Sequence, residues 1–252
     1  MKIKEIVSAL ERFAPLPLQE SYDNAGLQVG LTEAEASGAL LCLDVTEEAC
    51  EEAVDLGCYL IVAHHPLLFR GVKCVADTTQ VERCLRLAIK NDICIYAAHT
   101  TLDNAEDGVN YKMAEKLGLV DVVPLTGGGV LGYLMAEEDS LAFLQRVKDV
   151  FRIECLQHNE LLRRPIQSVA LCGGSGSFVL DTAIAQEADA FLTGEMGYHQ
   201  FFGHEQQIQI GVMGHFQSEQ YTTEIFQQII GECAPQLPIF TTEVNTNPIQ
   251  YL

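Results

Sequence analysis

The chain has 252 residues, of which 48% are hydrophobic and 20% are charged. This composition supplies enough apolar surface for a folded core and excludes an intrinsically disordered chain. Its 15 Lys and Arg against 35 Asp and Glu give a formal net charge of −20, which repels phosphate backbones and anionic lipid. Nucleic acid and membrane surfaces are therefore unfavourable partners, and a strong local positive charge has to come from bound metal.

The first predicted element is an amphipathic helix that begins near Ile3 and ends before Pro15, because its apolar residues recur at three- and four-residue spacing. Apolar runs and helices then alternate through the first half. The runs are predicted strands at 39–45, in YLIVAHHP (59–66) and in ICIYAAH (93–99), and the helices lie at 47–56 and about 80–90. This alternation is typical of a parallel sheet covered by helices.

The second half repeats this plan, which predicts an internal duplication and an α/β fold of two similar units with mostly parallel sheets. Its strands are expected in SVALCGGSG, AFLTGE and IQIGVMGH, with helices at about 178–187, 199–206 and 217–231. We assign residues 1–125 with 220–252 to the first unit and 126–219 to the second. Alternatively, the two halves look alike only because strand–helix–strand units resemble one another in all such folds.

The nine cysteines predict a reducing compartment. They are odd in number, form no Cys-x-x-Cys pair and mostly interrupt apolar runs, as expected of buried free thiols. The start, MKIKEIVSAL, lacks the long apolar segment and cleavage site of a secretory signal, and no run reaches the roughly 18 apolar residues of a membrane span. We therefore expect a cytoplasmic protein.

Polar side chains gather where the predicted strands end, which is where ligands collect in parallel sheets. They are His64, His65, His99, Asp103, Glu195, His215 and Glu219. Lining up the two halves places His99-x-x-x-Asp103 beside His215-x-x-x-Glu219. Taken singly, a histidine at the end of an apolar strand is more often a hydrogen-bonded core residue.

Each local pattern allows a structural and a functional interpretation. His64 and His65 can share one site only if the strand ends there, which Pro66 favours; the alternative is a turn with exposed imidazoles. His215 and Glu219 share a face if the helix already includes His215. Alternatively, Glu219 is a first-turn acid favoured by the helix dipole, and Asp103 is a helix N-cap.

Imidazole and carboxylate ligands suit Zn, Mn, Fe, Co or Ni, and the lack of paired cysteines disfavours a closed structural zinc site. Three histidines and two carboxylates fit two bridged ions about 3.5–4 Å apart. Such a pair lowers the pKa of a shared water, so that it supplies hydroxide for attack on an ester, amide, imine or phosphoryl centre.

Two further motifs carry weaker signals. The loop Gly173-Gly174-Ser175-Gly176-Ser177 follows a predicted strand and either cradles an anion with its backbone N–H groups or makes a tight turn. Glu195 and His199 occupy the repeat position of the His64–His65 pair, which makes them supporting or acid/base candidates.

The motifs SYDNAGLQVG, AHHP, AHTTLDNAEDGVN, CGGSGS, LTGE and GHFQSE occur in the order found in the dinuclear-metal-centre hexameric proteins labelled GTP cyclohydrolase I type 2 homologues, and the chain resembles that family along nearly its whole length. The resemblance implies metal ligands at His64, His65, Asp103, His215 and Glu219. It places no ligand at His99, which becomes a supporting residue. It also implies two similar units with the metals between them and a toroidal homohexamer. The chain is too short for the inserted middle domain of many relatives.

The preferred prediction is a protein that binds two divalent metal ions per chain and hydrolyses a small phosphorylated or nucleotide-like substrate with metal-bound hydroxide. The alternative is a metal-binding or regulatory partner-binding protein without turnover. The cysteine-based zinc signature of GTP cyclohydrolases is absent, so these residues do not support GTP ring opening.

Overall fold

In the computed structural model, which describes residues 1–252, short apolar runs form the centre of a first sheet. Its strands β2, β3 and β4 are fully buried and parallel and lie side by side in chain order. Helix α2 connects β2 to β3, and helix α3 connects β3 to β4. The sheet has the order β1-β4-β3-β2-β11, with β1 antiparallel to β4. The elements are β1 (Gly26–Val29), β2 (Ala39–Cys42), α2 (Glu47–Asp55), β3 (Leu60–Ala63), α3 (Gln80–Lys90), β4 (Cys94–Ala97) and β11 (Ile239–Thr241).

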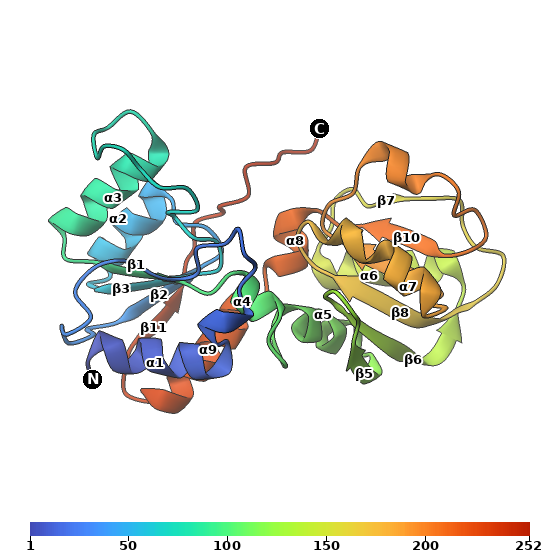
Figure 1. Ribbon diagram of the computed structural model, residues 1–252, viewed down its shortest axis with the longest axis horizontal. Coiled ribbons are helices and arrows are strands. Elements are labelled where there is room, and N and C mark those ends of the chain that lie inside the picture. Colours follow the sequence, from blue (N-terminus) through green and yellow to red (C-terminus); the bar gives the residue numbers. More distant parts are fainter. The chain divides into compact units, whose positions relative to one another are not determined.

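Helices cover both faces of this sheet, which is why its central strands carry no charged side chain (Figure 1). Helices α2 and α3 pack on one face, where Leu40, Ile61 and Ile95 meet Cys50 and Cys84. The opposite face is covered by α1 (Ile3–Phe13) and α9 (Thr222–Cys233), which lie below the strands in Figure 1. The 3-10 turn η1 (Leu16–Leu18) and the single-turn helix α4 (Thr100–Asp103) complete the unit.

The second sheet has the order β5-β6-β8-β9-β10-β7 and again contains three consecutive parallel strands. Those strands, β8, β9 and β10, correspond in order to β2, β3 and β4, and the antiparallel edge strand β7 beside β10 corresponds to β1 beside β4. The bounds are β5 (Val120–Pro124), β6 (Val130–Glu138), β7 (Gln157–His158), β8 (Ile166–Cys172), β9 (Ala190–Thr193) and β10 (Gln209–Val212). The α/β fold with mostly parallel strands is thus confirmed.

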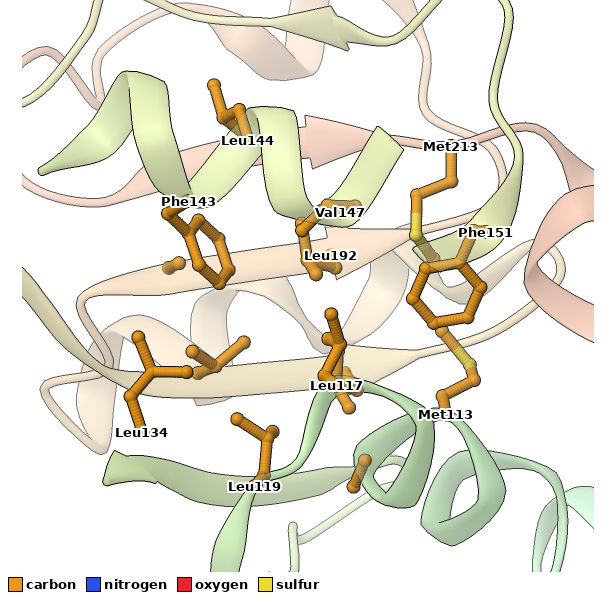
Figure 2. Close-up of a cluster of buried hydrophobic side chains, with 14 of the residues drawn as sticks. Met113, Leu117, Leu119, Leu134, Phe143, Leu144, Val147, Phe151, Leu192 and Met213 are labelled. Carbon is orange, nitrogen blue, oxygen red and sulfur yellow. The ribbon is translucent and has the colours of Figure 1, made fainter. Parts of the chain in front are cut away.

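Alternate residues of the second sheet build two separate cores. One face packs against α5 (Val109–Leu117) and α6 (Ser140–Phe151), where Phe143, Phe151 and Leu192 interdigitate (Figure 2). The other face packs against η2 (Gly176–Val179) and α7 (Leu180–Ala185) through Phe191 and Ile210. Because successive side chains of a strand point to opposite faces, the same strands contribute side chains to both cores.

The structure divides the chain differently from the sequence analysis. The first unit comprises 1–105 and 222–248, and the second comprises 106–221 and 249–252. Residues 106–125, which we assigned to the first unit, lie in the second because α5 enters its core and β5 pairs with β6.

Two predicted helices also differ from the structure. The helix expected at 217–231 occurs as two helices, α8 (His215–Glu219) and α9. The helix expected at 199–206 is the 3-10 turn η3 (Tyr198–Phe201).

The nine cysteines are all free, as their spacing predicted. Most are buried, whereas Cys74 and Cys155 are exposed. No helix is long and apolar enough to span a membrane.

Candidate metal centre

His64 and His65 stand where β3 ends. Both backbone N–H groups still donate to the neighbouring β2 segment, His64 to Cys42 and His65 to Leu43, at 3.3 and 2.9 Å. The two ring centroids are nevertheless only 4.9 Å apart, so the adjacent imidazoles do not point to opposite faces as they would inside a regular strand. The chain geometry thus meets the condition under which both histidines can serve one site.

The ring of His64 is buried and oriented by the backbone. Its Nδ1 atom lies 2.9 Å from the carbonyl oxygen of Ala98, which directly follows β4. Because a carbonyl oxygen only accepts, Nδ1 must carry a proton. The Nε2 atom lies 3.7 Å from Oδ1 of Asp103.

The ring of His65 is oriented by Asp44, which follows β2. Its Nδ1 atom lies 2.7 Å from Oδ1 of Asp44, and the other carboxylate oxygen accepts from the hydroxyl of Thr246 at 2.9 Å. Burial raises the pKa of Asp44, but the hydrogen bond and charge of His65 and the hydroxyl of Thr246 outweigh it and lower the pKa below its usual value. Asp44 therefore stays ionised and fixes the His65 ring.

His99 has the same kind of partner. Its Nδ1 atom lies 2.7 Å from Oδ1 of Asp23, while Oδ2 of Asp23 accepts from the backbone N–H and hydroxyl of Thr100. Burial raises the pKa of Asp23, but the hydrogen bonds from His99 and Thr100 bring it down to about 2. The helix α4 starts after His99 and contains Asp103 as its last residue, so Asp103 does not cap the following helix.

The first unit therefore holds a group of three imidazoles. Ligand nitrogens of His64, His65 and His99 lie within 4.8 Å of one another. His64 is buried, whereas His65 and His99 are partly exposed, so a small ligand can reach the group from solvent.

The second unit holds a group built around His215, the first residue of α8. Its Nδ1 atom lies 2.9 Å from Oε1 of Glu195, and its Nε2 atom lies 3.2 Å from Oε2 of Glu219. The hydroxyl of Ser175 donates to Oε2 of Glu195 at 2.6 Å. The pKa of Glu195 is lowered, first by that hydroxyl and then, against the effect of burial, by His215. Because α8 includes His215, the four-residue spacing brings Glu219 to the same face.

The glycine-rich loop after β8 packs against Glu219. A Cβ added to Gly174 would lie 2.3 Å from Oε1 of Glu219, and Gly174 has a φ of +55°. The N–H groups of Gly173 and Gly174 donate to the side chains of Asn110 and Ser218 at 2.9 Å each. These two N–H groups are therefore already bonded within the protein, and the loop serves to position the carboxylate.

All four strand-end histidines thus direct Nδ1 at an acceptor, which makes Nε2 the nitrogen that would bind a metal ion. The acceptor is a backbone carbonyl for His64 and a carboxylate for His65, His99 and His215. Metal-binding histidines show this arrangement, because the acceptor fixes the tautomer and raises the basicity of the ligand nitrogen. The donor set therefore fits divalent metal ions of the Zn, Fe, Mn, Co or Ni type.

The structure places the two weaker candidates in different surroundings. Glu195 contacts His215. His199 instead packs its ring against Tyr198 and Phe202. Asp23 and Asp44 were not identified, although Asp44 also follows a strand end and Asp23 lies within the motif SYDN.

Replacing Asp44 by Asn should weaken metal binding about 10- to 100-fold, because the amide can present a donor to His65 and no longer holds its tautomer. Competition with a chromogenic chelator would measure the change in affinity. Glu51→Gln, on the exposed side of α2, is the matched control. An unchanged affinity in Asp44→Asn would show that His65 needs no carboxylate partner.

Comparison with known proteins identifies the family and the fold that this chain shares. A family model described as Duf34/NIF3 (NGG1p interacting factor 3) matches residues 1–248. A Clostridium perfringens protein named GTP cyclohydrolase 1 type 2 homolog is 34% identical over 229 residues, which cover 87% of each chain. The Staphylococcus aureus hypothetical protein SA1388 superposes with a TM-score of 0.92 at 23% identity, covering 100% of this chain and 99% of the other. Reduced HcgD from Methanocaldococcus jannaschii gives a TM-score of 0.81 at 25% identity, covering 97% and 98%.

Proposed function

The chain belongs to the Duf34/NIF3 family, and from this premise we propose that it is a metal-dependent hydrolase acting on a small phosphorylated or nucleotide-like substrate. The observation that supports the proposal most strongly is the shared arrangement of its strand-end histidines. Four imidazoles each direct Nδ1 at an acceptor, which orients the ring and makes Nε2 the nitrogen that would bind a cation.

The proposed ligands are the five residues that the family resemblance implies. The first unit supplies the proposed ligands His64, His65 and Asp103, and the second unit supplies His215 and Glu219. Three nitrogens and two carboxylates suit two divalent ions better than one open catalytic ion. Two such ions, when bound, lower the pKa of water and polarise the bond to be broken.

The surrounding residues hold the ligands in place. Asp44 and Glu195 fix the rings of His65 and His215, and their lowered pKa values keep both carboxylates ionised at neutral pH. Gly174 lets Glu219 approach the loop after β8, where a larger residue would displace the carboxylate. Because the chain carries a net charge of −20, an anionic substrate needs this metal-dependent attraction to bind at all.

The experiment is to load the purified chain with each of the five metals, measure metal content, and assay phosphoesters, nucleotides and cyclic amidines. We expect metal-dependent turnover that Glu219→Gln abolishes and the exposed control Glu160→Gln retains. Turnover that survives removal of all metal would contradict the proposal. Full metal occupancy with no turnover on any substrate would also contradict it, and would favour a metal-binding protein without catalysis.

We also propose, from the family resemblance alone, that the chain assembles as a homohexamer. Light scattering should then give six times the chain mass of 27.7 kDa. A smaller assembly would contradict this.

A further inference from the structure

Two exposed aromatic rings adjoin the histidine group of the first unit. The Phe69 ring lies edge-on to His99, with 6.0 Å between ring centroids, and the Tyr22 ring lies 6.4 Å from Phe69. The His99 ring in turn lies 5.4 Å from both His64 and His65. An unbroken series of ring contacts therefore leads from the candidate metal ligands to the surface.

Both rings are exposed to solvent. Tyr22 is 65% exposed and Phe69 is 42% exposed. By contrast, Leu67, two residues before Phe69, packs against an apolar core of the first unit. An exposed aromatic pair beside a polar site is a common feature of ligand-binding surfaces, which combine apolar contact area with a few polar groups.

Hydrogen bonds hold the two loops that carry the rings. The Asn24 side-chain amide donates to the carbonyl of Leu68 at 2.7 Å, and the Leu68 N–H donates to Oε1 of Gln28 at 3.1 Å. Gln28 in turn donates to the carbonyl of Asn24 at 2.7 Å. This closed set of bonds ties the segment that carries Tyr22 to the segment that carries Phe69, so the two segments are already joined before any ligand arrives.

The type of ligand follows from the chemistry of the surface. Planar heteroaromatic rings stack on aromatic side chains without requiring a matching charge, which suits a strongly acidic protein. A negatively charged group on the same molecule would bind to the metal ions held by the ligand residues, since the chain has few Lys and Arg residues. A nucleotide combines both features.

We propose that Tyr22 and Phe69, whose rings are inclined at 64° to each other, form an aromatic platform for the substrate. The heteroaromatic ring of the substrate stacks on one ring and meets the other edge-on, and its anionic group binds at the metal centre. The proposal rests on the proposed function, because the platform matters only if metal attracts the anionic end. It defines the substrate class as a planar ring joined to a phosphate or carboxylate, instead of a simple phosphoester.

The test compares adenosine 5′-monophosphate with ribose 5-phosphate, which lacks the base, by calorimetric titration of the zinc-loaded full chain. We expect the nucleotide to bind at least about tenfold more tightly, the effect of stacking one base. Phe69→Ala and Tyr22→Ala should each reduce this preference severalfold while leaving metal content and ribose 5-phosphate affinity unchanged. Phe202→Ala, which removes an exposed ring of the second unit, is the matched control and should retain the preference.

Three results would overturn the proposal. The first is equal affinity of the wild type for the two ligands, and the second is an unchanged preference in Phe69→Ala and Tyr22→Ala. The third is a change in the mass of the assembly in Phe69→Ala, which would mean that the ring covers a contact between subunits. Zinc-dependent binding of ribose 5-phosphate without base preference would leave the metal proposal intact, whereas zinc-independent binding of both ligands would contradict the metal proposal as well.

Discussion

The His64→Ala variant is expected to lose more than about 100-fold in metal affinity, because it removes a proposed ligand itself and not only a residue that orients one. The His64 ring is buried, its Nδ1 atom is held by the Ala98 carbonyl, and it contacts the rings of His65 and His99. Metal content after gel filtration and chelator competition would measure the loss.

The matched control is His158→Ala, which removes an exposed histidine whose Nδ1 atom also has a carbonyl partner, Asn159. It should leave metal binding unchanged. The partner experiment is His215→Ala in the second unit, and a loss of both ions in either single variant would support one shared dinuclear centre. Loss of only one ion per variant would instead indicate that the two groups bind metal independently.

The Phe143→Ala variant is expected to lower the free energy of unfolding by about 3–5 kcal/mol. Phe143 lies on α6, is fully buried, and fills the core between α5, α6 and the second sheet together with Phe151 and Leu192 (Figure 2). Its removal both withdraws a large apolar surface from the core and leaves a cavity that the sheet cannot close. Urea denaturation of the metal-free chain, followed by far-ultraviolet circular dichroism, would measure the change.

The control for this experiment lies on the same helix. Leu141 is 61% exposed, so Leu141→Ala should change stability by no more than about 0.5 kcal/mol. Phe143→Leu should fall between the two, because it keeps part of the buried volume. Equal stability of Phe143→Ala and Leu141→Ala would show that this core does not determine the stability of the second unit.

The central strands of both sheets were predictable because they are buried on both faces and read as continuous apolar runs. The antiparallel half of the second sheet was not. The strand β5 is mostly exposed and β6 carries exposed residues through much of its length, so neither produces a continuous apolar run. For the same reason, the unit boundary at 105–106 could not be located from the pattern of apolar residues alone.

The metal-ligand candidates were recognisable because each follows directly on an apolar strand. Their partners were not, because hydrogen bonds between distant segments determine which acceptor each ring meets. Asp23 lies 76 positions before His99, and Asp44 lies 21 positions before His65. Only the register of β2 beside β3, and the path of the loop before β1, bring these pairs together.

The discontinuous first unit also determines the order in which the newly made chain can fold. Its sheet lacks the edge strand β11, its second face lacks α9, and Asp44 lacks the hydroxyl of Thr246 until the residues after 221 have been synthesised. The second unit, apart from its last four residues, is one continuous segment that emerges earlier from the ribosome. During translation, the half that carries His64 and His65 therefore gains its orienting contact at Asp44 only after the continuous segment of the second unit has been made.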